Sequence, residues 1–391
     1  MLRAEPDFSS LGIFAILNGA SRVALAVSGG SDSMALLRLV LDGLKVLSNP
    51  PHIFALTVDH SLRDASANEA MQVGVWCAAL GVPHEILKWN HDHPQSGIQA
   101  KARKARYDLM TAWCDVHNVP VLMTGHTADD QAETVKMRSS RTSTAASLAG
   151  IWPERDWNEI RVVRPLLNLR REDLRSYLRL HHQNWIDDPS NNDVRFERVR
   201  VRQTLKGALG GFADHAQSAQ AEIRHDQRLA ETWCTHHLHI HELGFTQFRR
   251  VDFEPLNNGV QGHVVQRILN ICGMQNSVEL AGRLKLLEWL NQETGTRRSL
   301  GGAVFAKRRL EIIVGREPGR LSQNAVSIPT SGEVIWDGRF RVTGPIGAIV
   351  TPRPQKPRQK DIPAFIQAGL PTVMLNGLIL NQGVKYEFLR H

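Results

Sequence analysis

The chain has 391 residues, of which 42% are hydrophobic and 22% are charged, and its formal net charge is +8. This length predicts two or three domains, and the composition is that of a soluble globular protein with no run near the roughly 20 apolar residues that cross a bilayer. The positive excess favours a polyanionic partner such as nucleic acid, although an ordinary basic surface would explain the same charge.

The cysteines and the first residues bear on the compartment. The four cysteines are widely spaced and form no CxxC pair, which predicts reduced thiols rather than disulfides or a cysteine-based metal site. Acidic residues Glu5 and Asp7 precede a short apolar run, and no basic leader accompanies them. We therefore expect no secretory signal and a cytoplasmic protein.

Short apolar runs alternate with helical patterns over residues 1–205. Strands are expected at 23–27, 53–58, 84–87 and 121–124, and helices at about 32–47, 66–80, 98–117 and 128–138. This alternation predicts an α/β domain, a Rossmann-like parallel sheet with helices on both faces. Ligands of such sheets bind beyond the carboxyl ends of the strands, where the segments 28–33, 59–63 and 125–130 should converge.

The pattern changes after residue 205. Residues 206–317 are expected to form a mostly helical module that ends in a hairpin, because apolar pairs recur at helical spacing before strand-like runs begin near Ser299. Residues 318–391 are rich in proline and glycine, which predicts a small β-containing module. No catalytic constellation is recognisable in either of these two modules.

A polar loop directly follows the first expected strand and precedes a helix: Ser28, Gly29, Gly30, Ser31, Asp32 and Ser33. Glycines let the backbone approach a ligand closely, and the amides at a helix start attract negative charge. The alternative is a Gly-Ser turn that merely caps a helix. The position after a buried strand favours a phosphate cradle, and the absence of the Walker pattern excludes a nucleoside-triphosphatase loop of that kind.

A second polar segment runs from Gly125 to Glu133. Thr127 is placed to cap a helix, and Asp130 completes a pattern like a capping box. That structural role leaves His126 and Glu133 unexplained. If His126, Asp130 and Glu133 share one face of this turn, the two carboxylates can bind Mg²⁺ or a substrate ammonium group.

Residues 161–202 contain ten arginines and no lysine. Alternation places Arg198, Arg200 and Arg202 on one face if this segment is extended. Arginine binds two phosphate oxygens at once through its planar guanidinium, which lysine does not do. The alternative is a solvated basic helix whose charges pair with nearby acids, and the sequence does not decide between the two.

Together these segments resemble the tRNA(Ile)-lysidine synthetases of the PP-loop ATP pyrophosphatase superfamily. The chain departs from that family at residues 141–147, where a loop of the form R-G-S-G is usual, and at Val199, where asparagine is usual. The matching segments are Val27–Ser33, Val58–His60 with Leu62-Arg63, Ala102-Arg103, Arg106-Tyr107, Gly125-His126, Ala128–Thr134, Met137-Arg138, Arg164–Leu167, Trp185–Arg202, Ser299–Gly302 and Arg308-Arg309.

The resemblance implies a substrate, two reaction steps and two cofactors. ATP with Mg²⁺ would adenylate the wobble cytidine, position 34, of the CAU anticodon of tRNA(Ile). Free L-lysine would then displace AMP to give lysidine. The modules 206–317 and 318–391 would bind and select the tRNA, partly through basic clusters at Arg297-Arg298, Lys307–Arg309 and 353–360.

The resemblance also implies roles for individual residues. The loop Ser28, Gly29, Gly30, Ser31, Asp32 and Ser33, with Asp59 and Gly125, would bind ATP. Asp130 and Glu133 would orient or deprotonate the lysine amine. His126 and Arg200 would stabilise charge on the α-phosphate. Asp32, helped by Asp130, would hold the Mg²⁺ ion.

Two other readings compete with this one. The first is another PP-loop enzyme, either tRNA-modifying or amide-forming; the missing CxxC and the lack of a glutaminase segment count against it. The second is a nucleic-acid-binding protein that has lost catalysis. The intact loop and the presence of His126, Asp130 and Glu133 count against that reading. The sequence predicts no oligomeric state.

Overall fold

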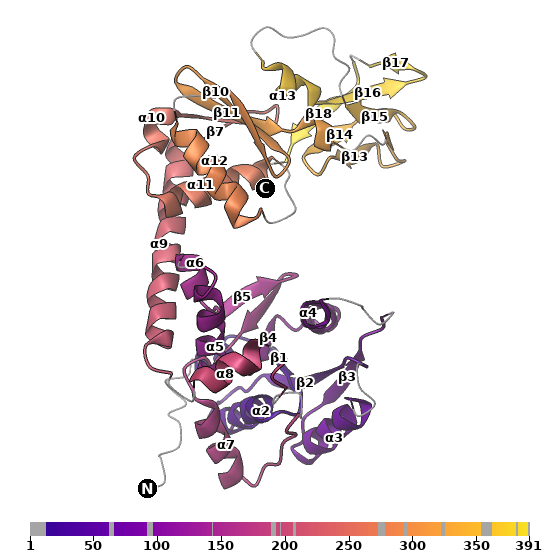
Figure 1. Cartoon of the computed structure of the whole chain (residues 1–391). Coiled ribbons are helices and arrows are strands. Elements are labelled where there is room, and N and C mark those ends of the chain that lie inside the picture. Colours follow the sequence, from indigo (N-terminus) through magenta and orange to yellow (C-terminus); the bar gives the residue numbers. More distant parts are fainter. Residues whose placement is uncertain are drawn as a thin grey trace. The chain divides into compact units, whose positions relative to one another are not determined.

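The computed structural model describes residues 13–61, 66–91, 97–142, 144–188, 193–195, 197–205, 209–272, 278–292, 296–321, 325–352, 362–380 and 382–389. The chain divides into two compact units, Met1–Glu222 and Ile223–His391 (Figure 1). The three-domain division at residues 205 and 317 stays a prediction. Leu62-Arg63, residues 189–192 and the basic run 353–360 lie outside the described residues.

A six-stranded sheet forms the centre of the first unit, in the order β3-β2-β1-β4-β6-β5. The strands β1, β2, β3, β4 and β6 run parallel, and β5 pairs antiparallel with β6. The expected parallel α/β sheet is confirmed, and the β5–β6 hairpin is an addition that the sequence did not predict. The strands are β1 (Arg22–Ala26), β2 (His52–Asp59), β3 (His84–Lys88), β4 (Val121–Thr124), β5 (Glu154–Trp157) and β6 (Ile160–Val163).

Helices cover both faces of this sheet because alternate strand residues point in opposite directions. Val23 and Leu25 of β1 pack into the core that includes α2, α3 and α7, whereas Ala24 packs into the core that includes α4. The helices are α1 (Ile13–Asn18), α2 (Ser31–Leu44), α3 (Ser66–Ala79), α4 (Ile98–Val116), α5 (Ala128–Ser139), α6 (Ala145–Leu148), α7 (Arg171–Leu180) and α8 (Glu197–Leu205).

The order of the strands fixes the position of the site. Strand β1 lies between β2 and β4. The chain leaves β1 toward β2 on one side and leaves β4 toward β6 on the other, so the strand order reverses between β1 and β4. Ligands of open parallel sheets bind at such a point. Figure 1 shows α2 leaving β1 and α5 leaving β4, and these two connections carry both polar segments that the sequence singled out.

The second unit begins within the long helix α9 (Phe212–His237), which spans the boundary between the units, and continues through α11 (Asn258–Ile271) and α12 (Leu280–Asn291). The expected change from helical to strand-rich sequence is confirmed. The remaining elements are α10 (Arg250–Phe253), η3 (Pro318–Arg320), α13 (Ala364–Ala368), a sheet of β7 (His239–Ile240), β8 (Thr246–Arg249), β11 (Glu311–Arg316), β10 (Ala303–Arg308) and β9 (Arg297–Leu300), a sheet of β12 (Val326–Ser327), β15 (Ile349–Pro352), β16 (Pro371–Leu375) and β17 (Leu378–Ile379), and a sheet of β13 (Glu333–Trp336), β14 (Phe340–Thr343) and β18 (Lys385–Phe388).

None of the helices in the described parts of the chain combines the length and the apolar character that a membrane span requires.

The core of the second unit is shared between its helices and its sheets. Phe248 of β8, Val264 of α11 and Phe305 of β10 belong to one cluster of buried residues. The helices of this unit therefore pack on its sheet rather than standing alone.

Gly125, directly after β4, sets the spacing between that strand end and the start of α2. A Cβ at this position would lie 2.8 Å from the carbonyl oxygen of Asp32 and 3.1 Å from the amide nitrogen of Ser33. We expect Gly125→Ala to lower the free energy of unfolding by about 1–3 kcal/mol, because backbone rather than a flexible side chain must shift. Urea unfolding measures this.

Gly210→Ala is the matched control, because a Cβ there meets nothing within 4 Å. If the two variants have the same free energy of unfolding, the end of β4 and the start of α2 can move apart without loss of stability.

Candidate active site

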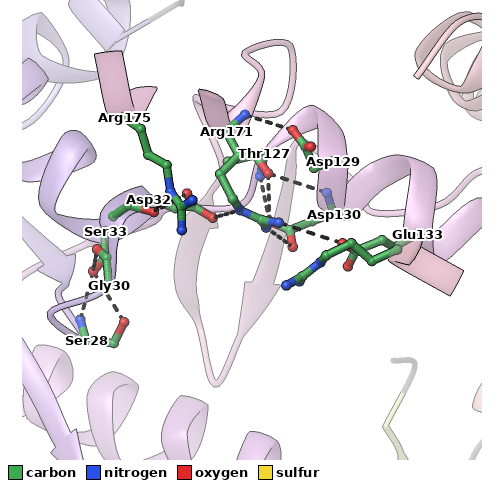
Figure 2. Close-up of polar contacts among 12 residues, drawn as sticks. Ser28, Gly30, Asp32, Ser33, Thr127, Asp129, Asp130, Glu133, Arg171 and Arg175 are labelled. Carbon is green, nitrogen blue, oxygen red and sulfur yellow. Dashed lines mark hydrogen bonds and ion pairs between the residues drawn. The ribbon is translucent and has the colours of Figure 1, made fainter. Parts of the chain in front are cut away.

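The loop after β1 is closed by its own hydroxyl groups. The Ser28 amide donates to Ser33 Oγ at 3.1 Å, and Ser33 Oγ donates to the Gly30 carbonyl at 2.9 Å (Figure 2). Gly29 has a φ of +85°, and a Cβ there would lie 2.8 Å from Ile186 Cδ1. The carbonyl of Gly29 accepts a 2.9 Å hydrogen bond from the amide of Ile186. These contacts close the loop, and the positive φ together with the close approach of Ile186 requires glycine at position 29.

Helix α2 starts at Ser31 with open amide groups. Its N-cap residue is Gly30, and within the described structure no side chain forms a capping hydrogen bond there. The first backbone bond of the helix joins the Met34 amide to the Gly30 carbonyl at 3.0 Å. The amides before Met34 are thus available to an anion, as the phosphate-cradle prediction requires.

Asp130 has a structural role and an electrostatic one. Its Oδ2 accepts hydrogen bonds from the Thr127 amide at 2.9 Å and from Thr127 Oγ1 at 3.0 Å, and the Thr127 side chain caps α5 in return. The capping box expected from the sequence is therefore present. Burial raises the pKa of Asp130, but the positive charges of Arg198 and Arg171 outweigh it and lower the pKa to about 2.

Glu133 is 1% exposed and is held by two arginines of α8. Its Oε2 accepts from Arg198 Nε at 2.6 Å, and its Oε1 accepts from Arg202 Nε at 2.6 Å. Arg198 Nη2 also donates to Asp130 Oδ1 at 2.8 Å. Asp130 and Glu133 therefore share one face of α5, as the sequence indicated.

Arg171, the first residue of α7, connects the two polar segments (Figure 2). Its Nε donates to Asp32 Oδ2 at 2.9 Å, and its Nη2 donates to Asp130 Oδ1 at 3.1 Å. Its Nη1 lies 3.7 Å from Glu133 Oε1. Its backbone amide donates to Asp129 Oδ2 at 2.8 Å, which fastens the start of α7 to α5.

Asp32 lies in the first turn of α2, beside the open amides. Its Oδ1 accepts from Ser31 Oγ at 3.1 Å. Burial raises the pKa of Asp32; the positive charge of Arg171 opposes this rise, and the negative charge of Asp130 adds to it. The structure thus brings Asp32, Asp130 and Glu133 to one cluster with Arg171, Arg198 and Arg202, which we call the charge cluster.

His126 is neutral at physiological pH in this arrangement. Burial lowers its pKa to about 3; the negative charge of Asp130 opposes this, and the positive charges of Arg103 and Arg164 reinforce it. Its Nδ1 lies 2.9 Å from Thr124 Oγ1. A contribution of His126 to a phosphate is therefore a hydrogen bond rather than a full positive charge.

Two predicted site residues point elsewhere. Asp59, at the end of β2, accepts hydrogen bonds from the Ser61 amide at 2.8 Å and from Ser66 Oγ at 2.7 Å, and so it fastens its own loop. Arg200 is exposed, and its Nη1 donates to the carbonyls of Val194 and Arg195. The roles of Asp59 in ATP binding and of Arg200 in catalysis stay predictions.

The sequence left open whether residues 198–202 are extended, with three arginines on one face, or helical; this segment lies in helix α8. Residues four apart share a face of a helix, whereas residues two apart do not. Arg198 and Arg202 consequently reach Glu133, and Arg200 faces away.

Sequence reasoning also missed Arg171 and Arg175, whose spacing of four residues was the available signal. Arg175 Nε lies 3.4 Å from Ser31 Oγ, and its Nη2 donates to Asp187 at 3.0 Å. The side chain of Arg175 thus lies against the loop after β1.

Comparison with known proteins shows what the chain is similar to. The model of a PP-loop domain matches residues 8–209. A tRNA(Ile)-lysidine synthase of Wolbachia pipientis is 32% identical over 385 residues, covering 92% of this chain and 88% of that protein. The chain belongs to the tRNA(Ile)-lysidine synthase family. A synthase of Mesorhizobium japonicum is 41% identical over 225 residues, covering 55% of this chain and 48% of that protein.

The relatives are named as synthases, which are ligases, and the matched domain is a PP-loop domain that uses ATP. The chain is therefore an ATP-using enzyme. Among solved structures, the U34-tRNA thiolase NcsA from Methanococcus maripaludis has a TM-score of 0.48 at 15% identity, covering 56% of this chain and 78% of that one. The NMN synthetase from Francisella tularensis has a TM-score of 0.35 at 11% identity, covering 57% and 95%. Neither TM-score reaches 0.5, so neither likeness supports a statement about function.

The neutral state of His126 is testable by titration. We expect its imidazole to remain neutral from pH 8 down to pH 5 in the folded, ligand-free protein, since its pKa is lowered to about 3. In the urea-unfolded chain it should protonate near pH 6.5. Proton–nitrogen NMR spectra of the histidine rings measure both, with His126→Gln to assign the signal. Protonation of His126 near pH 6.5 in the folded protein would contradict the burial argument.

Proposed function

We propose that the enzyme ligates free lysine to C2 of cytidine 34 in the CAU anticodon of a tRNA(Ile). In the first step the cytidine O2 attacks the α-phosphorus of ATP, and pyrophosphate leaves. In the second step the lysine ε-ammonium loses a proton to solvent, the resulting amine attacks C2, and the bond between C2 and the adenylated O2 breaks, so that AMP leaves. The supporting observation is that open helix amides and three carboxylates, bridged by Arg171, meet at one sheet edge.

The open start of α2 suits the pyrophosphate that departs in the first step. Its open amides supply hydrogen-bond donors to the phosphate oxygens. Arg171 and Arg175 lie beside this loop and add the positive charge that developing negative charge needs. His126 would contribute one neutral hydrogen bond.

Mg²⁺ fits this site as a companion of ATP. No group of three or more histidines, cysteines or acids in the described residues is placed to hold a metal. Mg²⁺ usually takes one or two carboxylates and several phosphate oxygens. Asp32, beside the open amides, suits one such place. When bound, the ion offsets phosphate charge. A metal role for Asp130 would require its bonds to Thr127, Arg171 and Arg198 to be exchanged.

The acceptor amine arrives with a positive charge, because the side-chain pKa of lysine is near 10.4. Asp130, with a pKa of about 2 in the ligand-free protein, is ionised and can pair with this ammonium once a guanidinium gives way, but it is too weak a base to remove the proton. We therefore assign Asp130 and Glu133 to the binding and orientation of lysine in the charge cluster.

The second unit supplies a surface suited to tRNA phosphates. Arg249, Arg308 and Arg309 line a hollow of about 270 Å³ together with Leu310 and Glu311. Lys307 serves the fold instead, because its Nζ contacts the carbonyls of Trp289 and Gln292. We assign the three arginines to contacts with tRNA outside the anticodon, which add discrimination that a single base contact of about 1–3 kcal/mol does not provide.

The direct test of the proposed function is incorporation of radiolabelled lysine into tRNA(Ile) bearing the CAU anticodon. We expect incorporation that depends on ATP and stops when cytidine 34 is replaced. Asp32→Ala should lower the rate on the order of 10²-fold or more. Glu172→Gln is the control, since Glu172 lies on the exposed side of α7 and pairs with Arg179. ATP-dependent turnover without lysine in the tRNA would refute the proposal.

The tRNA surface is tested separately. Neutralising Arg308 and Arg309 together, as Arg308→Gln with Arg309→Gln, should weaken tRNA binding and reduce its salt slope by about two. ATP affinity should not change. Arg341→Gln is the control, because Arg341 pairs with Glu387 at 2.8 Å on another sheet of the same unit. An unchanged salt slope in the double variant would remove these arginines from the tRNA contact.

A further inference from the structure

The charge cluster is electrically balanced before any ligand enters. Three carboxylates, of Asp32, Asp130 and Glu133, contact three guanidinium groups, of Arg171, Arg198 and Arg202. Arg171 contacts all three carboxylates, at 2.9, 3.1 and 3.7 Å. Formal charges of −3 and +3 cancel, so an incoming ammonium meets no net attraction.

The carboxylate oxygens that lysine would use are already occupied. Asp130 Oδ1 accepts from both Arg171 and Arg198, and its Oδ2 accepts from Thr127. Both Glu133 oxygens accept from arginines, and the side chain is 1% exposed. An ammonium group therefore has to displace a guanidinium, which is a bidentate partner and the stronger competitor for a carboxylate.

Arg171 lies where ATP would draw it away. Its Nε contacts Asp32, a residue in the first turn of α2 beside the open amides, while its Nη atoms face Asp130 and Glu133 (Figure 2). Phosphate groups at those amides would place new negative charge next to the guanidinium. Arginine binds phosphate in the same forked manner as carboxylate.

The backbone of Arg171 is fixed, so the exchange needs only its side chain. The Arg171 amide is held by Asp129, and Leu174 and Leu178 of α7 are fully buried in the core with α2. The surrounding carboxylates raise the pKa of Arg171 above its ordinary value despite burial, so the group stays charged. Its release from Asp130 therefore requires another anion rather than loss of a proton.

We propose that Arg171 is a positioning residue that closes the lysine subsite until the phosphates of ATP draw its guanidinium away from Asp130 and Glu133. Lysine then binds after the nucleotide, because the cluster has lost the positive charge of Arg171 and can accept the lysine ammonium in its place. This inference rests on the proposed function. It adds an order of binding and a residue that enforces it.

The order is tested by calorimetric titration of lysine into the full chain, without nucleotide and with α,β-methylene ATP, whose α,β bridge is not cleaved. We expect the dissociation constant for lysine to be lower by about tenfold or more in the presence of the analogue. Because coupling between two binding sites is reciprocal, lysine should tighten the analogue by the same factor.

Substitution of Arg171 should remove this coupling in a way that general damage to the fold would not. In Arg171→Gln, lysine should bind about tenfold more tightly than in the wild type without nucleotide, since one carboxylate charge is uncompensated. The analogue should then add little. Arg171→Lys keeps the charge and should restore part of the coupling. Arg179→Gln is the control, because Arg179 lies on the same helix and pairs with the exposed Glu172.

The possible results separate the inference from the proposed function. Equal lysine affinity with and without the analogue overturns the inference, and incorporation of lysine into tRNA would still support the function. Unchanged lysine binding in a folded Arg171→Gln also overturns it. Absence of lysine binding in both states overturns the inference, and absence of incorporation into tRNA refutes the function. If Arg171→Gln fails to fold, the reciprocal titrations of the wild type decide.

Discussion

The partly buried guanidinium of Arg171 contacts three carboxylates, and the organisation of the first unit depends on that contact. Unpaired charges are costly to bury, so Asp32 and Asp130 can lie near each other only because a cation lies between them. The same contact joins the start of α2, the start of α5 and the start of α7. Removing it would alter the phosphate side and the amine side of the site together.

The fold makes this meeting possible through strand order. Because β1 and β4 are neighbours, the helices that leave them start side by side, and each brings a carboxylate in its first turns. Gly125 allows the two connections to approach within backbone contact. Asp129 then receives the amide of Arg171, so α5 also sets the direction in which α7 begins. Asp130 thus caps its own helix, and the adjacent Asp129 holds the start of α7.

The electrostatics of the site suit the two successive steps of the proposed reaction, which have opposite needs. The first step develops negative charge on phosphate, and Arg171 and Arg175 are placed to meet it. The second step requires a cationic amine to come close to C2, and Asp130 and Glu133 are placed for that. Shared arginines resolve this conflict, since a guanidinium that moves toward phosphate leaves a carboxylate free for the amine. His126, kept neutral by burial, adds no charge to either side.

The sequence by itself determined the parallel α/β unit, the loop 28–33 and the capping box of Thr127 and Asp130, because each depends on residues close together in the chain. It also indicated that Asp130 and Glu133 share a face. Only the tertiary structure decided which arginines serve them. In a strand, residues 198, 200 and 202 would share a side; in helix α8, Arg198 and Arg202 face Glu133 and Arg200 turns away. The spacing of Arg171 and Arg175 was a signal in the sequence, but the three partners of Arg171 could not be predicted, because they lie 38 to 139 positions away and meet it only when the sheet is assembled.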